Sequence, residues 1–204
     1  MARYRGPRVR IARRFGTALF GLTRKSTQKR PYPPGQGAQF RRFKFSEYKK
    51  KLIEKQKLRY NYGINERQLR RLMEEAKKSH EPTGMVLLRL MEQRLDNVVF
   101  RLGFAPTVPA ARQLVAHGHV RVDGHRVDIP SFRVQPGQEI QIQEKSRQNE
   151  LINNTLQNPT LRLPSYLSYD GAEYKGRMES LPNRDDVPIQ VDEQLVVEYY
   201  AQRL

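Results

Sequence analysis

The sequence predicts an α+β protein with three parts: an extended basic N-terminal arm, a small helical domain completed by the C-terminus, and an inserted helix-helix-hairpin module. Three observations support this. Positive charge is concentrated at the N-terminus, apolar residues recur at helical spacing between residues 46 and 116, and an Asp-Gly turn follows within alternating residues. We place the arm at residues 1–45, the mainly helical domain at 46–93 plus 164–204, and the inserted module at 94–163.

Net charge separates the arm from the rest of the chain. The first 60 residues contain 19 Lys and Arg against 2 Asp and Glu, whereas residues 61–204 contain 19 of each, so the N-terminal part carries the whole formal charge of +17. A basic arm on a neutral body is typical of nucleic-acid binding. The alternative is an arm for anionic membranes. The Pro and Gly residues among the charges disfavour it, because they prevent one long amphipathic helix.

Aromatic residues are scattered among the charges of the arm, which shows little helical or strand periodicity. Guanidinium groups bind phosphates, and aromatic rings stack on exposed bases. The alternative is a disordered tail whose rings pack back onto the body. We expect both in part: the arm orders on RNA, and some rings anchor it to protein. Residues 32–35, Tyr-Pro-Pro-Gly, are expected to be extended.

Helical periodicity begins at Ser46, which is expected to cap a helix that ends near Gly63. Asn65 is expected to cap a second helix, and Thr83 to open a third that continues to Leu95. Beyond the module, the asparagines at 153, 154 and 158 predict a loop, and residues 166–169 and 174–178 predict short strands. The apolar segment 195–199 is expected to pack onto the N-terminal helices.

The inserted module begins with two short amphipathic helices. In the first, Leu95, Val98, Val99 and Leu102 form one apolar stripe, while Arg94, Asn97 and Arg101 fall on another face. In the second, Thr107 is expected to be the N-cap, with Pro109 in the first turn. Its inward residues are Val108, Ala111, Leu114 and Val115, and its other face carries Pro109, Arg112, Gln113 and Ala116. Gly103 and Gly118 are the expected left-handed stops.

A hairpin follows the second helix, because Asp123-Gly124 is a strong two-residue turn signal between alternating residues. This turn pairs Arg121 directly with Arg126, with the valines on the opposite face. Like charges opposite each other destabilise a sheet, and a polyanion over that face would reverse the effect. The alternative is that both arginines extend into water with little repulsion. We favour the anion, because Arg94, Arg101 and Arg112 are expected nearby. Residues 138–142 predict a third strand.

Several classes of site are disfavoured. Cysteine is absent, which excludes disulfides and thiolate zinc sites, and no apolar run approaches the roughly 20 residues of a membrane span. The N-terminus is not expected to be a targeting leader. His117 and His119 without a third close ligand make a poor metal site, and the acids at 185, 186, 192 and 193 are expected to be solvated. No nucleotide-loop or hydrolase motif occurs. We therefore expect no metal, no cofactor and no enzyme activity.

Residues 94–142 resemble the S-four RNA-binding domain, a helix-helix-hairpin module. The matching residues are Arg94-Leu95-Asp96, Val99, Arg101-Leu102-Gly103, residues 111–115, His117-Gly118-His119-Val120, Val122-Asp123-Gly124, Val127, Pro130-Ser131 and Gly137. Asp123 departs from the commonest asparagine at its position. The carboxylate also suits the turn, although it is a worse neighbour for phosphate.

The rest of the chain resembles the small-subunit ribosomal proteins of the S-four family, in order and over essentially the full length. The matching segments are residues 1–7, 29–36, 54–63, 66–69, 87–103 and 192–200. The pattern is similar to the bacterial or plastid branch, which implies location in the ribosome of a bacterial cytoplasm or a plastid stroma. Many relatives carry an N-terminal cysteine knuckle for zinc; this chain lacks the cysteines, so zinc is not carried over.

The resemblance implies a structural constituent of the small ribosomal subunit and a primary binder of small-subunit ribosomal RNA. Such proteins grip a multi-helix RNA junction and nucleate assembly of the subunit body. They also lie beside the messenger entry channel and contact ribosomal protein five, an interface linked to translational accuracy.

Two sets of residues are expected to contact RNA. The set on the module is Arg94, Arg101, Arg112, Gln113, His117, His119, Arg121 and Arg126. The set on the arm is Arg3, Arg5, Arg8, Arg10, Arg13, Arg14, Arg41 and Arg42. Two other functions are alternatives. An RNA-modifying enzyme would need a catalytic domain for which too little chain remains, whereas a messenger-RNA-binding translational regulator stays open as a second role.

Overall fold

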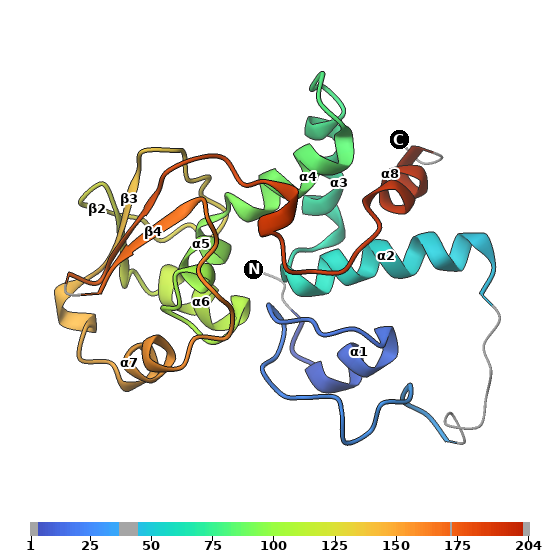
Figure 1. Cartoon of the computed structure of the whole chain (residues 1–204), viewed down its shortest axis with the longest axis horizontal. Coiled ribbons are helices and arrows are strands. Elements are labelled where there is room, and N and C mark those ends of the chain that lie inside the picture. Colours follow the sequence, from blue (N-terminus) through green and yellow to red (C-terminus); the bar gives the residue numbers. More distant parts are fainter. Residues whose placement is uncertain (1–3, 37–44, 172, 202–204) are drawn as a thin grey trace. The chain divides into compact units, whose positions relative to one another are not determined.

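The computed structural model of the chain describes residues 4–36, 45–171 and 173–201 (Figure 1). It contains two compact units: unit 1 comprises residues 1–87 with 189–204, and unit 2 comprises residues 88–188. Helices and a small antiparallel sheet are both present, so the predicted α+β class is confirmed. Among the described residues, no helix has both the length and the apolar character needed to cross a membrane.

Unit 1 is helical. Its helices are α1 (Arg8–Phe15), α2 (Glu47–Asn61), α3 (Glu66–Ala76) and α8 (Glu193–Ala201), and α4 (Thr83–Glu92) begins in it. Ser46 Oγ accepts a hydrogen bond from the Lys49 amide, and Asn65 forms a reciprocal capping box with Gln68. Both predicted caps are confirmed. Helix α4 ends three residues before the predicted Leu95, because the chain turns at Arg94, which is extended and precedes the next helix.

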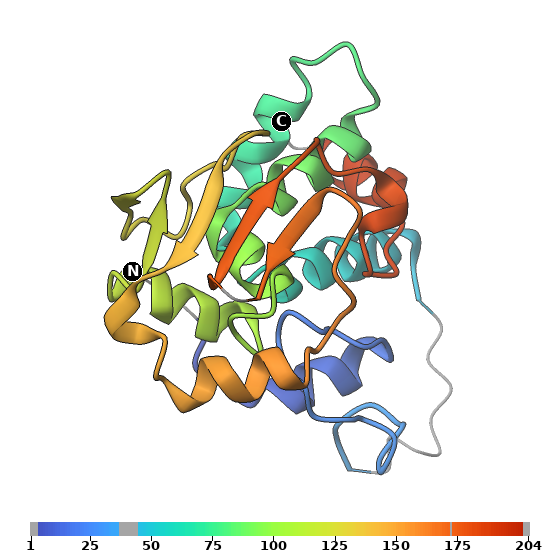
Figure 2. The same cartoon turned by 60° about the vertical axis from the view of Figure 1, so that its left-hand side comes forward.

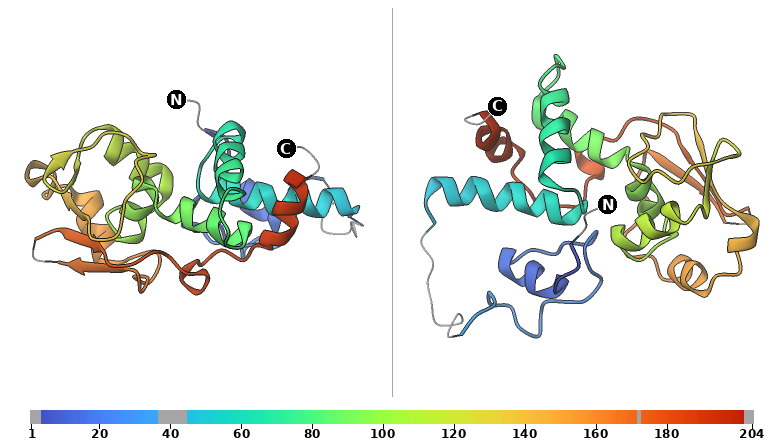
Figure 3. Two further views of the ribbon diagram at one scale, coloured as in Figure 1. Left: turned by 90° about the horizontal axis from the view of Figure 1, so that it is seen from above. Right: turned by 180° about the vertical axis from the view of Figure 1, so that it is seen from behind.

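The C-terminal helix α8 packs against α2 and α3, as predicted from its apolar residues (Figure 3). Val196 and Tyr199 of α8 are buried, and the Tyr200 hydroxyl donates to Glu66 Oε1 at 2.7 Å. The buried Lys55 ammonium lies 2.7 Å from the other oxygen of Glu66. Burial raises the pKa of the Glu66 carboxyl, but the hydrogen bonds from Lys55 and Tyr200 outweigh it and hold that pKa below its ordinary value. Helices α2 and α3 thus meet the distant C-terminal helix α8 at one carboxylate.

The arm contains a helix, so the prediction of little regular structure before residue 46 is wrong for α1. Gly16, with φ of 64°, ends this helix in the left-handed conformation. Ala12 is buried on α1, and Leu19 and Leu22 are buried in the loop that follows. The ring of Tyr60 on α2 contacts both Tyr4 and Phe15. The expectation that some rings anchor the arm is therefore confirmed. The helix escaped prediction because it is only eight residues long, too short to form by itself, and it is stabilised by packing onto α2.

Unit 2 contains a five-stranded antiparallel sheet of order β2-β1-β3-β5-β4. The strands are β1 (Val120–Val122), β2 (His125–Arg126), β3 (Glu139–Ile142), β4 (Leu167–Asp170) and β5 (Lys175–Met178). The three strands predicted after the hairpin turn, near residues 138–142, 166–169 and 174–178, all form. Because β5 pairs with β3, residues 164–188 lie in unit 2 and not in the helical domain to which the sequence assigned them.

One face of the sheet is apolar and is covered by α5 (Leu95–Arg101) and α6 (Val108–Ala116), as Figure 2 shows. The buried strand residues on this face are Val120, Val122, Ile140, Ile142, Leu167 and Met178. The predicted inward residues of both helices are also buried. A further helix, α7 (Glu150–Gln157), is capped by Asn149, whose side chain accepts from the Leu151 amide. The prediction of a loop is wrong for Asn153 and Asn154, because Asn149 acts as a cap and Ile152 anchors the helix in the core. It is confirmed for Asn158, which follows the helix.

Helix α5 approaches the sheet closely at Gly176, in the middle of β5. A Cβ built there would come 2.6 Å from Cδ1 of the buried Leu102. We expect Gly176→Ala to destabilise the chain by about 1–3 kcal/mol, because Leu102 has no room to move. Gly171→Ala is the matched control, since its Cβ would meet Tyr169 at an ordinary 3.6 Å. Urea unfolding of both variants tests this; equal midpoints would contradict the close packing.

Candidate nucleic-acid interface

The hairpin has the register that the sequence predicted. Arg121 is the direct partner of Arg126, and Val122 that of His125. Asp123 and Gly124 have φ values of 49° and 78°, as a two-residue turn with two left-handed positions requires. The Asp123 carboxylate accepts from the Glu139 amide at 2.8 Å and from the Gln138 side chain at 2.8 Å. The aspartate therefore ties the turn to β3.

Arg121 and Arg126 are both exposed, on the face of the sheet opposite the core. The guanidinium of Arg126 lies over the backbone of Gly118, because a Cβ built on this glycine would come 2.6 Å from Arg126 Cζ. Gly118 follows the C-terminal end of α6 and has φ of 74°. The partial negative charge of a helix C-terminus favours a cation there. Gly118 thus gives Arg126 the room to lie in a favourable position.

The side chains around this end of α6 form what we call the basic corner: Gln113, His117, His119, Arg121 and Arg126. Gln113 and His117 are exposed and one helical turn apart. The half-buried His119 ring lies 6.1 Å from that of His117, and its Nδ1 is 2.8 Å from Ser146 Oγ. The corner therefore offers guanidinium, amide and imidazole groups on one surface, all of them groups that hydrogen-bond RNA.

Three predicted RNA-binding arginines are buried instead. Arg94, Arg101 and Arg112 are only 6%, 5% and 7% exposed. The prediction that they lie with Arg121 and Arg126 on an open basic face is wrong. The first turn of α5 is covered by the segment 129–134, whose Pro130 and Phe132 carbonyls accept hydrogen bonds from the Asp96 and Leu95 amides. A helical wheel shows the faces of a helix but not which distant segment covers them.

Two of these arginines converge on Asp96, which is fully buried. Arg94 donates to both Asp96 oxygens, at 3.1 and 2.8 Å, and Arg112 donates to Oδ2 through two nitrogens, at 3.0 and 2.6 Å. Asp96 also lies in the first turn of α5, where the helix dipole favours an anion. The carboxylate therefore links α5 to α6.

The third arginine, Arg101, belongs to a second buried cluster. Its Nε lies 3.6 Å from Glu92 Oε2, and its guanidinium donates to the Asp186 carbonyl. Glu92 also accepts from Asn97 at 2.6 Å and from the Tyr166 hydroxyl at 2.8 Å. Burial, and then the Glu92 carboxylate, raise the pKa of Tyr166 well above its ordinary value. Arg101 thus joins α5 to the segments on either side of the β4–β5 pair.

The outer face of the sheet extends the basic corner in a way that sequence reasoning missed. Arg126, Arg121, Gln141 and Lys175 are successive partners across β2, β1, β3 and β5. Lys175 is paired with Glu139 and Glu173, at 3.5 and 2.5 Å, whereas the two arginines lie on the edge strand β2 and its neighbour β1. The alternation of residues 174–178 predicted a strand; only the pairing of β5 with β3 brings Lys175 into line with the hairpin.

The predicted arm residues lie in α1 and beside it. Arg5, Arg8, Arg10 and Arg14 are exposed, and Arg13 is half-buried. Arg3, Arg41 and Arg42 lie outside the described residues. No His, Asp or Glu cluster of metal-binding size occurs within residues 4–36, 45–171 and 173–201. The described surfaces offer positive charge and hydrogen-bond donors, which suit the binding of a phosphate backbone.

Comparison with known proteins assigns both parts of the chain. The model of the Ribosomal protein S4/S9 N-terminal domain matches residues 3–92, and that of the S4 domain matches residues 93–140. Proteins named small ribosomal subunit protein uS4 are similar over their whole length and all of this chain. The relative from Methylobacillus flagellatus is 52% identical over 205 residues, and that from Nostoc sp. is 54% identical over 204. A uS4B protein from Nitrosomonas europaea is 53% identical over 205 residues.

The buried Asp96 carboxylate gives a test of the structure beneath the basic corner. We expect Asp96→Asn to destabilise the chain by about 3–5 kcal/mol, because it leaves two buried guanidiniums without their counter-charge. Asp128→Asn is the control, since Asp128 is exposed. Chemical unfolding of the two variants measures the difference. A loss at Asp96 no larger than that at Asp128 would mean that the arginines are held by other groups.

Proposed function

The chain belongs to the S4 family of small ribosomal subunit proteins, and on this basis we propose that it is a structural constituent of the small ribosomal subunit that binds the subunit's RNA. The family is structural and not catalytic, in agreement with the prediction that the chain is not an enzyme. The S4 domain match covers α5, α6 and the hairpin, which carry the whole basic corner.

One observation carries the proposal most directly: Arg121 and Arg126 are exposed cross-strand partners. Two like charges held side by side repel each other in the free chain, and a phosphate between them removes that repulsion. The corner adds further hydrogen-bonding side chains around the pair, from Gln113, His117 and His119. RNA phosphates position a protein on the nucleic acid, while the amide and imidazole groups are suited to sugar or base edges.

The arm contributes a second kind of binding. Residues 4–36 contain nine Lys and Arg and no Asp or Glu. Such charges replace condensed counterions on RNA, which gives strong, salt-dependent attraction with little sequence preference. Helix α1 is anchored on α2, so part of this charge is held in fixed positions before RNA arrives. The folded corner would supply the selectivity and the arm most of the attraction.

The finer assignments follow from the family resemblance. The chain would be a primary binder of small-subunit ribosomal RNA that nucleates assembly of the subunit body. With ribosomal protein five it would influence translational accuracy, and messenger RNA at the entry channel would be a neighbour. The cellular location would be the ribosome of a bacterial cytoplasm or of a plastid stroma. Binding and assembly measurements can test the proposed partners and the role in assembly.

A role as a messenger-RNA-binding translational regulator is the alternative, and the family match does not favour it. A salt titration of binding distinguishes the two. We expect binding to small-subunit ribosomal RNA to persist at salt concentrations that abolish binding to an unrelated structured RNA of equal length. Loss of both at the same salt concentration would refute a specific ribosomal role. Competition by the chain's own messenger would then measure the regulatory role.

Replacing the exposed arginine pair tests the corner. We expect Arg121→Ser combined with Arg126→Ser to weaken ribosomal RNA binding at least tenfold and to lower the salt slope by roughly 1–2, because two phosphate contacts are lost. The melting temperature of the free protein should stay within about 3 °C, since removing the repulsion offsets the lost helix-terminus contact.

The matched control removes two other exposed charges from unit 2, with Lys145→Ser and Arg162→Ser. An equal loss of RNA affinity in both double variants would show that only net charge matters. A large fall in melting temperature for the first pair would instead assign Arg121 and Arg126 a structural role.

A further inference from the structure

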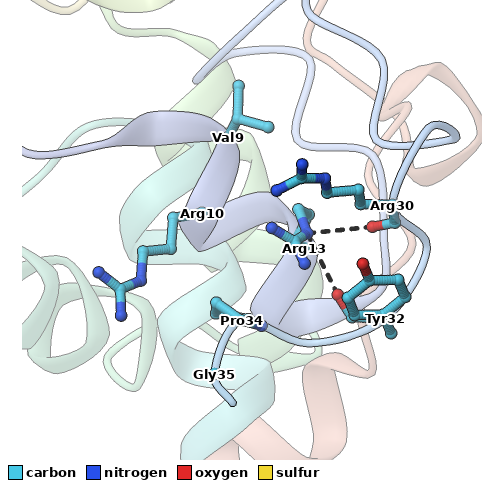
Figure 4. Close-up of a pocket in the computed structure, with 7 residues that line it drawn as sticks. All are labelled: Val9, Arg10, Arg13, Arg30, Tyr32, Pro34 and Gly35. Carbon is cyan, nitrogen blue, oxygen red and sulfur yellow. Dashed lines mark hydrogen bonds between the residues drawn. The ribbon is translucent and has the colours of Figure 1, made fainter. Parts of the chain in front are cut away.

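Helix α1 and the segment 30–35 enclose a hollow of about 430 Å³ in unit 1 (Figure 4). Its lining residues are Val9, Arg10, Arg13, Arg30, Tyr32, Pro34 and Gly35. Three of the seven are arginines, and they come from two segments that are separated by the buried loop 19–22. The volume lies within the ~300–1,000 Å³ range of small-ligand pockets and is larger than a lone phosphate needs.

Arg13 holds the hollow in shape. Its Nε donates to the carbonyls of Arg30 and Tyr32, at 3.0 and 3.2 Å, and its guanidinium lies 5.1 Å from the centre of the Tyr32 ring. These contacts tie α1 to the far end of the loop. They use one nitrogen of the guanidinium, and its partners are neutral groups. The N–H groups of the two terminal nitrogens therefore remain available as donors, and the guanidinium keeps its full charge.

The walls of the hollow are fixed by the chain around it. Pro33 and Pro34 restrict the backbone beyond Tyr32. Leu19 and Leu22 are buried, and the Gly21 amide donates to the buried Asn61 side chain on α2 at 3.0 Å. The loop is therefore seated on unit 1 at its middle and closed by Arg13 at its end. A site built in this way loses little conformational entropy when a ligand binds.

Charge in the hollow is uncompensated. Arg10 and Arg30 are exposed, and no Asp or Glu occurs between residues 4 and 36. Figure 4 shows the Arg30 and Arg13 guanidiniums on one side of the hollow and the Arg10 side chain on another. The ion pairs formed within the described part of the chain do not include any of these three arginines. Two neighbouring guanidiniums, those of Arg13 and Arg30, without a carboxylate favour a phosphate group.

We propose that this hollow binds one nucleotide of a single-stranded segment of the ribosomal RNA, with its phosphate against the Arg30 guanidinium and the terminal nitrogens of Arg13. The inference rests on the proposed function and adds a defined site to it. Loops and junctions are the RNA elements whose nucleotides leave the helical stack and become available to such a site. The arm would then contribute selectivity for RNA shape in addition to charge.

The test compares two double variants of the full chain. Arg10→Gln with Arg30→Gln removes two charges from the hollow, and Arg8→Gln with Arg14→Gln removes two exposed charges from the same helix and its end. We expect the first pair to lower affinity for small-subunit ribosomal RNA at least tenfold more than the second. Binding to an unrelated structured RNA should fall equally in both, because only charge matters there.

Arg13→Lys supplies a test of geometry at constant charge. Lysine cannot bond two carbonyls through one nitrogen while presenting two further nitrogens, so we expect this variant to lose most of the affinity that the hollow contributes. Its melting temperature, measured in parallel, shows whether the fold is retained. If Arg13→Lys is folded and binds ribosomal RNA like the unaltered chain, the proposed geometry is wrong.

The remaining outcomes separate the site from the function. Equal losses for the two double variants would overturn the site while leaving ribosomal RNA binding intact. Failure of the unaltered chain to prefer ribosomal RNA would instead overturn the proposed function. A last experiment uses inorganic phosphate. If it raises the melting temperature of the unaltered chain but not of the Arg10/Arg30 variant, while RNA binding is the same in both, the hollow binds a free anion and not RNA.

Discussion

The buried carboxylate of Asp96 is the constraint on which the basic corner depends. It lies at the start of α5 and receives four hydrogen bonds from two arginines, one of which, Arg112, belongs to α6. The position of α6 fixes Gly118 at its end, and Gly118 in turn fixes where Arg126 lies. The buried Asp96 carboxylate thus determines where the exposed Arg126 lies. Such a buried pair adds little net stability compared with apolar packing, but breaking it is costly, so it specifies one arrangement of the two helices.

The five arginines of unit 2 that the sequence predicted to bind RNA therefore fall into two groups with different roles. Arg94, Arg101 and Arg112 are buried, form ion pairs with Asp96 and Glu92, and join elements of the fold. Arg121 and Arg126 face solvent from adjacent strands. Their mutual repulsion is tolerable because water screens it, and it disappears when an anion binds. A count of basic residues treats all five alike, whereas the structure leaves two of them available to RNA in the free chain.

Local signals in the sequence were sufficient for much of this structure. Ser46, Asn65 and Thr107 cap helices, and the Asp123-Gly124 turn sets the register that pairs Arg121 with Arg126, because these features depend on a few neighbouring residues. Burial of Arg94, Arg101 and Arg112 could not be predicted in the same way. It depends on segments 129–134 and 165–187, which return to α5 from far along the chain. The same limitation applies to β5, whose place beside β3 follows from tertiary pairing. Helices α1 and α7 are short, and their polar residues resemble those of loops.

The groups that bond to an arginine determine whether its charge is still available to bind an anion. In unit 2, Arg94 and Arg112 are fixed by one carboxylate, and the same contact that orients them offsets part of their charge. In unit 1, Arg13 is fixed by two carbonyls and an aromatic ring, none of which carries a formal charge. The first arrangement stabilises the fold, whereas the second holds a charged guanidinium in a fixed position. Because preorganised cations lose little entropy when they meet phosphate, Arg13 and its neighbours Arg10 and Arg30 have the properties of a binding site, while the better-bonded arginines of α5 and α6 have those of a scaffold.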